Sequence, residues 1–270
     1  MSYEWFSQKA RAVRKQALEM TVSAGKGHLG GAFSCVEILV ALYYGGIFRI
    51  NPTDIQNALR DRFIFSKGHA CLALYPILAD LGFFSPDVLE TYGKNGSMLG
   101  GHPDHLIPGV EISTGSLGHG LNVCCGLALA AKMDRIDAVA IALIGDGECN
   151  EGSVWEAAIF AASRELDNLV AIVDNNKIGA TAFTANFFRG RNVVERWRSF
   201  GWAVTVVDGH DFEQLLSAYK NVRANNLCKP HVIIAETIKG KGVSFMENRP
   251  EWHHGVPQGE LLTLARKELE

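Results

Sequence analysis

Residues Ile141–Ile178 read IALIGDGECNEGSVWEAAIFAASRELDNLVAIVDNNKI, and the pattern of this stretch decides the fold. One apolar run, Val139–Ile144, ends at Gly145-Asp146-Gly147, and a second, Leu169–Val173, ends at Asp174-Asn175-Asn176. The residues between them follow a helical period, so the stretch predicts a β-α-β unit. Because such a crossover makes the two strands parallel, we expect both polar exits at one edge of the sheet, where open α/β sheets bind ligands.

The two strand exits carry oxygen ligands. Asp146 offers a carboxylate, Asn176 an amide oxygen, and the chain just beyond offers a backbone carbonyl. Hard oxygen donors of this kind suit Mg²⁺, which completes its shell with water and substrate phosphates. Gly147 lets a diphosphate approach the backbone, and we expect the N-terminus of the next helix to favour the anion. Since Gly-Asp-Gly alone is a common turn, the ligand interpretation depends on its pairing with the later Asn-Asn.

Length and composition limit the class of protein. A chain of 270 residues that is 47% hydrophobic can bury a large core, and we expect residues 1–270 to be a single domain with an N-terminal helical extension. A net charge of −3 gives no reason to expect nucleic acid or an anionic membrane as partner. No apolar run reaches the ~18 residues that a membrane span needs, and the N-terminus lacks the apolar core of a signal peptide. The six cysteines contain no CxxC pair. These features predict a cytoplasmic protein with reduced thiols.

Strands and helices alternate along the rest of the chain. Strands are expected at 62–66, 202–207 and 231–235, and helices at about 10–24, 54–59, 70–81, 118–133, 211–223 and 259–269. Ser34 and Glu37 form a capping-box pattern that predicts a further helix, ending near Tyr44. Residues 93–118 and 178–192 lack periodicity, and long irregular segments inside a domain are usually functional or disordered. The order predicts an α/β fold: a doubly wound, largely parallel sheet with helices on both faces.

Six of the nine histidines neighbour a glycine in predicted loops: His28, His69, His102, His119, His210 and His254. Binding and catalytic groups concentrate in loops, although a single loop histidine is more often a surface or turn residue. We interpret His210, within Asp208-Gly209-His210-Asp211, as part of a strand-to-helix turn with an aspartate N-cap. His105 and His231 belong to no motif.

Several of these segments occur together in transketolases, and the chain resembles the first domain of that family. The Gly-Asp-Gly to Asn-Asn spacing resembles the thiamine diphosphate motif. The other shared segments, in transketolase order, are Gly27-His28, Arg62–His69, Gly100–Pro103, Thr114–Gly120, Asn176–Ile178, Asp208–Asp211 and Lys239 followed by Trp252-His253. Because a full-length transketolase continues with a pyrimidine-binding and a C-terminal domain, the chain resembles the N-terminal half of a split transketolase.

The resemblance implies ligands for a metal ion and for thiamine diphosphate. The implied ligands of Mg²⁺, which Ca²⁺ or Mn²⁺ can replace, are Asp146, Asn176 and the carbonyl of Ile178. The implied contacts of the cofactor are His69 and Gly147 to the diphosphate, backbone of Gly115, Ser116 and Leu117 to the rings, and Lys239 nearby. Glu151 corresponds to an acidic residue near the subunit interface.

Histidines are the implied catalytic groups. His28 and His102 would meet the hydroxyls of the donor sugar, and a third histidine would lie by the diphosphate and the reacting carbonyl. For this third group the spacing from Lys239 favours His253, whereas the His-Gly step favours His254. The chain departs from the family at Ser116, where proline is usual, and at His119, where glutamine is usual.

By resemblance, the enzyme transfers a two-carbon ketol unit from a ketose or ketose phosphate to an aldose or aldose phosphate. The glutamate that activates the cofactor and the arginines that hold the sugar phosphate belong to the family's second domain, so a C-terminal partner subunit is implied, in an α2β2 heterotetramer. Two alternatives are one half of a deoxyxylulose-phosphate-synthase-like enzyme, suggested by residues 27–31 and 36–39, and a non-catalytic cofactor-binding subunit. A nicotinamide oxidoreductase is disfavoured because no G-x-G-x-x-G follows a first strand.

Overall fold

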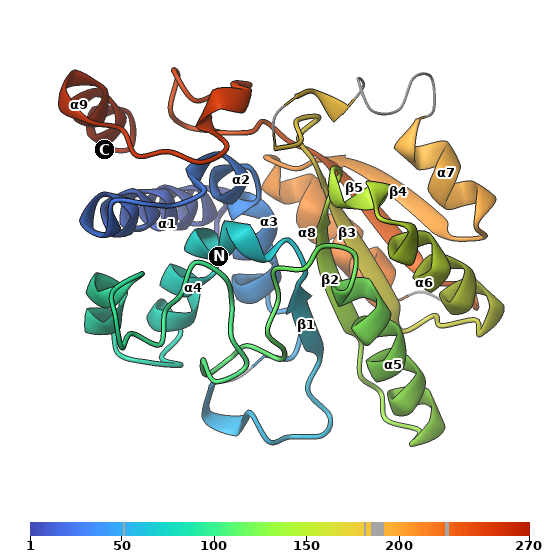
Figure 1. Ribbon diagram of the computed structural model, residues 1–270. Coiled ribbons are helices and arrows are strands. Elements are labelled where there is room, and N and C mark those ends of the chain that lie inside the picture. Colours follow the sequence, from blue (N-terminus) through green and yellow to red (C-terminus); the bar gives the residue numbers. More distant parts are fainter. Residues whose placement is uncertain (51, 181, 185–191, 225–226) are drawn as a thin grey trace.

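The computed structural model describes residues 1–50, 52–180, 182–184, 192–224 and 227–270 (Figure 1). The strands are β1 (Arg62–Phe65), β2 (Ala140–Gly145), β3 (Leu169–Asn175), β4 (Ala203–Asp208) and β5 (His231–Glu236). The α-helices are α1 (Tyr3–Ala24), α2 (Leu29–Ser34), α3 (Val36–Tyr44), α4 (Tyr75–Asp80), α5 (Gly120–Met133), α6 (Gly152–Ser163), α7 (Val193–Ser199), α8 (Phe212–Arg223) and α9 (Gly259–Glu268). Part of the predicted irregular stretch 178–192, namely 181 and 185–191, lies outside the described residues.

The described strands form one sheet in the order β1-β2-β3-β5-β4, and every pairing is parallel. The central strand β3 is buried along its whole length, as expected for a parallel strand covered on both faces. The sequence prediction of a doubly wound α/β sheet is therefore confirmed. The parallel pairing brings the carboxyl ends of all five strands to one edge.

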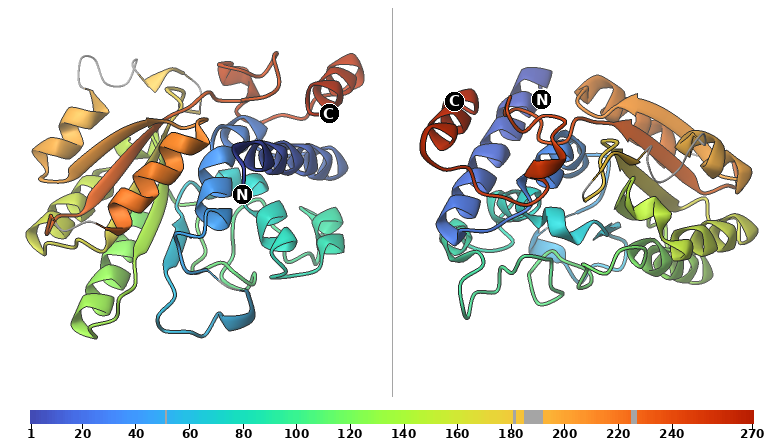
Figure 2. Two further views of the ribbon diagram at one scale, coloured as in Figure 1. Left: turned by 180° about the vertical axis from the view of Figure 1, so that it is seen from behind. Right: turned by 45° about the horizontal axis from the view of Figure 1, so that its top comes forward.

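Two apolar layers cover the sheet. Alternate strand residues such as Ile141 and Ile172 pack with α1, α2, α3, α4 and α8, while their neighbours such as Ala142 and Val173 pack with α5, α6 and α7. Figure 1 shows α5 and α6 in front of the sheet, and the reverse view in Figure 2 shows α8 on the other face. This alternation follows from the two-residue period of a strand.

Helix α1 belongs to the same core as the strands. The Ser2 side chain accepts a hydrogen bond from the Trp5 N–H at its start, and Gly25 ends it in the left-handed conformation, with φ of 68°. Helix α9 lies beside α1 in both views (Figures 1 and 2), where Arg266 pairs with Glu19 at 2.7 Å. In the described part of the chain, none of the helices is both long and apolar enough to cross a bilayer.

The predicted capping box is wrong. Ser34 ends α2 instead of opening a helix, and its hydroxyl donates to Asp174 at 2.6 Å, while Glu37 pairs with Arg14. Hydrogen bonds to buried charged groups are stronger than the hydrogen bonds of a neutral cap. Both side chains therefore bond to partners on other elements instead of capping a helix. Helix α2 also occupies residues that the sequence analysis assigned to a loop.

Three other element predictions need correction. The helix expected at 54–59 is only a 3-10 turn, Pro52–Asp54, followed by turns. The helix expected at 70–81 is divided into a 3-10 segment, Gly68–Ala73, and α4, whose first turn contains Pro76. Helix α7 was not predicted, although Asn192 caps it by accepting from the Val194 N–H, a recognisable start signal.

Candidate functional site

The carboxyl ends of β2 and β3 open into a cavity of about 390 Å³. The residues that sequence reasoning placed in one site and that line this cavity together are His69, Gly115, Leu117, Asp146, Gly147, Asn176, Ile178, Lys239 and His253. They come from segments that are far apart in the sequence and meet because parallel strands share one exit edge. A second cavity of about 360 Å³ at the amino end of β1 lies away from these groups.

The proposed metal ligands have orientations fixed by hydrogen bonds. Asp146 accepts from the N–H groups of Gly147 at 2.8 Å and Lys177 at 2.7 Å, one on each carboxylate oxygen. Asn176 donates its Nδ2 to Asp174 Oδ2 at 3.2 Å, and its Oδ1 accepts from the Ile178 N–H at 3.1 Å. Lys177 between them is left-handed, with φ of 66°, an uncommon conformation that concentrates at functional sites.

This donor set fits a divalent cation that prefers oxygen. Asp146 and Asn176 each keep lone pairs beyond the backbone bonds they accept, and the Ile178 carbonyl already contacts a cation, the Lys239 ammonium, at 3.2 Å. Within the described residues there is no cluster of three histidine, cysteine or acidic side chains that could hold a metal. An ion here would therefore be held by one carboxylate together with an amide and a carbonyl oxygen, and Mg²⁺ would complete its shell with water and ligand phosphates.

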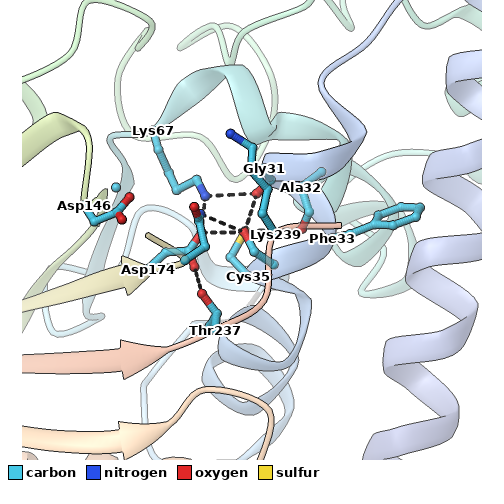
Figure 3. A network of polar contacts seen from close by, with 12 residues as sticks. Gly31, Ala32, Phe33, Cys35, Lys67, Asp146, Asp174, Thr237 and Lys239 are labelled. Atoms are coloured by element: carbon cyan, nitrogen blue, oxygen red, sulfur yellow. Dashed lines mark hydrogen bonds and ion pairs between the residues drawn. The ribbon is translucent and has the colours of Figure 1, made fainter. Parts of the chain in front are cut away.

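A buried ion pair lies beneath the cavity (Figure 3). The ammonium of Lys67 pairs with the carboxylate of Asp174 and donates to the Gly31 carbonyl at 2.9 Å. Ser34 and Thr237 donate their hydroxyls to the same carboxylate, so Asp174 connects α2 with the segment that follows β5. Burial would raise the pKa of Asp174, but Lys67 and these donors hold it below its ordinary value.

Lys239 reaches the cavity from the segment after β5. Its ammonium donates to the Gly179 carbonyl at 2.7 Å and lies 2.9 Å from His253 Nδ1. Burial, and then the charge of Lys67, lower the pKa of Lys239 to about 8. The side chain is almost fully buried, so it presents a positioned positive charge to any anionic ligand in the cavity.

Five imidazoles gather at the mouth of the cavity. The His28 ring lies 5.5 Å from that of His69, 6.3 Å from His102, 5.3 Å from His253 and 4.6 Å from His254, measured between ring centroids. His253 lines the cavity next to Lys239, whereas His254 is exposed and packs edge-on against His28. Both candidates for the third histidine therefore belong to the cluster, at different depths.

The cluster keeps its inner imidazoles neutral. Burial lowers the pKa of His28 to about 4, with smaller effects from the neighbouring His254 and His102. Burial and nearby positive charges lower the pKa of His69 to about 2 and that of His253 to about 3. A neutral imidazole can donate a hydrogen bond from one nitrogen and accept at the other, which suits contacts with sugar hydroxyls.

Glycine is required at one point beside this cluster. Gly115 has a φ of 146°, and a Cβ there would lie 2.9 Å from Cδ2 of His102. Gly147 has an ordinary right-handed backbone, and a 3-10 turn, Glu148–Asn150, separates it from α6. The helix N-terminus expected directly after Gly147 is therefore displaced to Gly152.

Two residues named from the family resemblance lie outside both the cavity lining and the histidine cluster. Ser116 is exposed, and its hydroxyl lies 3.3 Å from His119 Nδ1. Glu151 is exposed at the N-cap of α6, and its side chain would contact a Cβ added at Gly118. Neither side chain contributes to the cavity wall, so any contact of Ser116 with a ligand would come from its backbone.

Sequence reasoning missed three buried polar residues of the site. Glu148 lines the cavity and accepts from the N–H groups of Gly118 at 2.9 Å and Gly145 at 3.1 Å, and burial raises its pKa. Lys67 and Asp174 entered the sequence reasoning only as parts of motifs. The available sequence signal for these residues was a charged side chain inside or beside an apolar strand. Such a charge is almost never buried without a partner, so its position indicates a buried ion pair or hydrogen bond.

Comparison with known proteins identifies the family of the chain. Residues 6–269 match the family described as transketolase, thiamine diphosphate binding domain. The chain is 42% identical over 269 residues to a Phocaeicola vulgatus protein that is named as a subunit of apulose-4-phosphate transketolase, covering 100% of this chain and 95% of that one. It is 40% identical to the 6-deoxy-6-sulfo-D-fructose transketolase subunit SqwG of a Clostridium species, covering 95% of that relative.

Longer transketolases match over part of their length. The chain is 38% identical to the Homo sapiens transketolase but spans only 38% of it. Among solved structures, the Campylobacter jejuni transketolase superposes with a TM-score of 0.92 and 30% identity, over 100% of this chain and 43% of that one. The chain thus corresponds to the N-terminal part of these transferases, and it belongs to the transketolase family as the thiamine-diphosphate-binding N-terminal subunit of a split enzyme.

Proposed function

We propose that this chain supplies the diphosphate- and metal-binding half of a transketolase that moves a two-carbon ketol unit from a ketose phosphate to an aldose phosphate. The observation that carries the proposal is the single cavity in which Asp146, Asn176 and Ile178 meet His69, Lys239 and His253. Thiamine diphosphate, when bound, supplies the carbanion chemistry that transfers the two-carbon unit. The remaining tasks, which are binding, orientation and proton transfer, fall to side chains of the two subunits.

The oxygen donors would hold Mg²⁺ against the diphosphate. Asp146 and Asn176 bring one charge and one amide oxygen, and Ile178 brings a carbonyl. Lys239, whose ammonium donates to that carbonyl at 3.2 Å, adds a positive charge that favours a polyanion. His69, partly buried and neutral in the cavity wall, can donate a hydrogen bond to a phosphate oxygen.

Four imidazoles of the cluster would orient the sugar. The rings of His102, His253 and His254 each lie beside that of His28 and, together with it, can hydrogen-bond the substrate hydroxyls. A neutral imidazole can also take a proton from a hydroxyl or return one to a developing alkoxide. Removing a donor that stabilises such an oxyanion typically lowers turnover by ~10²–10³-fold.

The proposal includes a partner subunit in an α2β2 heterotetramer. The chain spans about two fifths of the full-length transketolases it matches. The relatives that it matches over 95% of their own length are named as subunits. An exposed apolar face on α5 and α6 supports a contact between subunits there: Val123, Ile159 and Phe160 are 37%, 54% and 37% exposed. We assign this face to the C-terminal subunit, which would carry the cofactor-activating glutamate. Cytoplasmic location stays a prediction.

The names of the relatives support a proposal for the substrate class. Two relatives are named for apulose-4-phosphate and one for 6-deoxy-6-sulfo-D-fructose, so we propose a modified ketose with an anionic end as the donor. The test mixes the chain with a pyrimidine-domain subunit, thiamine diphosphate, Mg²⁺ and apulose-4-phosphate or a common ketose phosphate. Ketol transfer by the mixture but not by either chain alone is expected. Robust turnover by the isolated chain would contradict the split-site proposal.

Two further outcomes separate the alternatives. Release of CO₂ from pyruvate would indicate a deoxyxylulose-phosphate-synthase-like reaction, and binding without turnover of any ketose would indicate a non-catalytic subunit. The metal assignment has its own test, because Asp146→Ala should abolish Mg²⁺-dependent binding of thiamine diphosphate measured by calorimetry. An Asp146→Ala chain that retains Mg²⁺-dependent binding would remove Asp146 from the metal site.

A further inference from the structure

The His210 side chain links helices on one face of the sheet to the segment that carries Lys239. The residue belongs to Asp208-Gly209-His210-Asp211, at the carboxyl end of β4, and does not line the cavity. Its N–H donates to Asp208 at 2.8 Å, and Asp211 begins α8 as the expected N-cap. The turn explains the backbone of this motif, but it does not explain why the side chain is a largely buried imidazole.

Both ring nitrogens of His210 have defined partners. Nε2 accepts from the main-chain N–H of Ile238 at 2.9 Å, and Nδ1 lies 2.9 Å from Glu37 Oε2. Because a main-chain amide can only donate, Nε2 must be unprotonated, and Nδ1 must therefore carry the hydrogen that it donates to Glu37. The imidazole is thus held in one tautomer by a carboxylate, a common way to orient a histidine.

The carboxylate is itself fixed. Arg14 donates to both oxygens of Glu37, at 2.5 and 2.7 Å, and to the Phe33 carbonyl at 2.8 Å. Burial would raise the pKa of Glu37, but the Arg14 charge and the His210 hydrogen bond lower it to about 2. Glu37 therefore stays ionised, and the chain of contacts from α1 through α3 to His210 is rigidly paired.

The far end of this chain of contacts is the site. Ile238 lies between Thr237, which donates to Asp174, and Lys239, whose ammonium contacts Ile178, Gly179 and His253. The Gly209 N–H also donates to the Glu236 carbonyl at 2.8 Å, so the 208–210 turn holds the main chain after β5 at two points. We propose that His210 is a positioning residue: its Nε2 fixes the Ile238 amide and thereby places Lys239 in the cavity.

A matched pair of variants tests the two hydrogen bonds of the His210 ring separately. Gln in His210→Gln extends an acceptor oxygen to the Nε2 position and can retain the Ile238 bond. Asn in His210→Asn reaches only the Nδ1 position, so it can retain the Glu37 bond but loses Ile238. Loss of one neutral hydrogen bond typically changes an equilibrium by about five- to tenfold.

The readouts are amide hydrogen exchange at Ile238 and calorimetric binding of thiamine diphosphate with Mg²⁺ to the full-length chain. We expect His210→Gln to stay close to wild type, and His210→Asn to exchange faster at Ile238 and bind the cofactor about five- to tenfold more weakly. Wild-type affinity and protection in His210→Asn, or equal losses in both variants, would overturn the inference. Only the binding readout rests on the proposed function, so a wild-type chain that binds no cofactor, either alone or together with the C-terminal subunit, would refute that function and leave the exchange test intact.

A measurement on the unaltered protein covers the case in which the variants fold poorly. Two-bond ¹H–¹⁵N spectra distinguish the tautomers of a neutral histidine, and His210 should show a protonated Nδ1 and an unprotonated Nε2. A protonated Nε2 would exclude the Ile238 hydrogen bond and with it the positioning role.

Discussion

Replacing Asp174 by asparagine should strongly destabilise the chain. Lys67 is 2% exposed and Asp174 is fully buried, so Asp174→Asn would leave a buried ammonium without its paired carboxylate. Neutral acceptors would remain, namely the Gly31 carbonyl at 2.9 Å and the new amide oxygen, but neither supplies a counter-charge. Breaking a buried ion pair by removing one partner costs about 3–5 kcal/mol of folding free energy. We expect a loss of this size in the free energy of unfolding.

The assay is urea unfolding of the cofactor-free chain at pH 7, followed by tryptophan fluorescence. The midpoint should fall while the urea dependence stays constant, because the area exposed on unfolding is unchanged. Thr237→Val is the control: it removes one hydroxyl donor to Asp174 but keeps the charge pair, and should cost only about 1–3 kcal/mol. A loss below about 1 kcal/mol for Asp174→Asn, or an equal loss in the control, would refute the reasoning.

Two further predictions concern the core and the backbone. The pKa of Glu37 is about 2 in the fold against an ordinary 4.5, so its stabilisation, on the order of 3 kcal/mol, should be present above pH 4.5 and lost as pH falls toward 2. Urea midpoints of Glu37→Gln should lack this acid slope; parallel slopes in both proteins would argue against it. Gly30→Ala should destabilise the chain by about 1–3 kcal/mol, because the Cβ of the new alanine would lie 2.6 Å from the Trp252 carbonyl oxygen. Since Trp252 directly precedes His253, the same substitution should weaken cofactor binding. Gly126→Ala on α5, with nothing within 4 Å, should instead stabilise the isolated chain by about 0.5–1 kcal/mol, and equal unfolding midpoints for the two variants would contradict the steric argument.

The candidate site was foreseeable where chemistry follows a strand directly. Asp146 and Asn176 come at the ends of apolar runs, and a β-α-β crossover forces both ends to one edge of the sheet. The family resemblance added His28, His69, His102, Lys239 and the 253–254 pair, and the structure gathers all of them at the same cavity mouth or wall.

The errors have a common physical origin. Ser34 and Glu37 satisfy a local capping rule, yet both side chains bond to charged groups that only the fold brings near, Asp174 and Arg14. His210 likewise reads as a turn residue because Ile238 and Glu37 are distant in sequence. A local sequence pattern takes account only of hydrogen-bond partners that are near in the sequence. It cannot anticipate a stronger partner on another helix or strand.

The sequence by itself determined the parallel α/β fold, the position of Asp146 and Asn176 at one edge of the sheet and the family of the chain, since strand periodicity and motif order are properties of the linear chain. Only the tertiary structure decided which buried polar groups support the cavity: the Lys67–Asp174 pair, the buried Glu148 and the contact from Arg14 through His210 to Ile238. The reason is that a charge can be buried only where its counter-charge and hydrogen-bond donors converge, and that convergence comes from packing elements that the sequence separates widely.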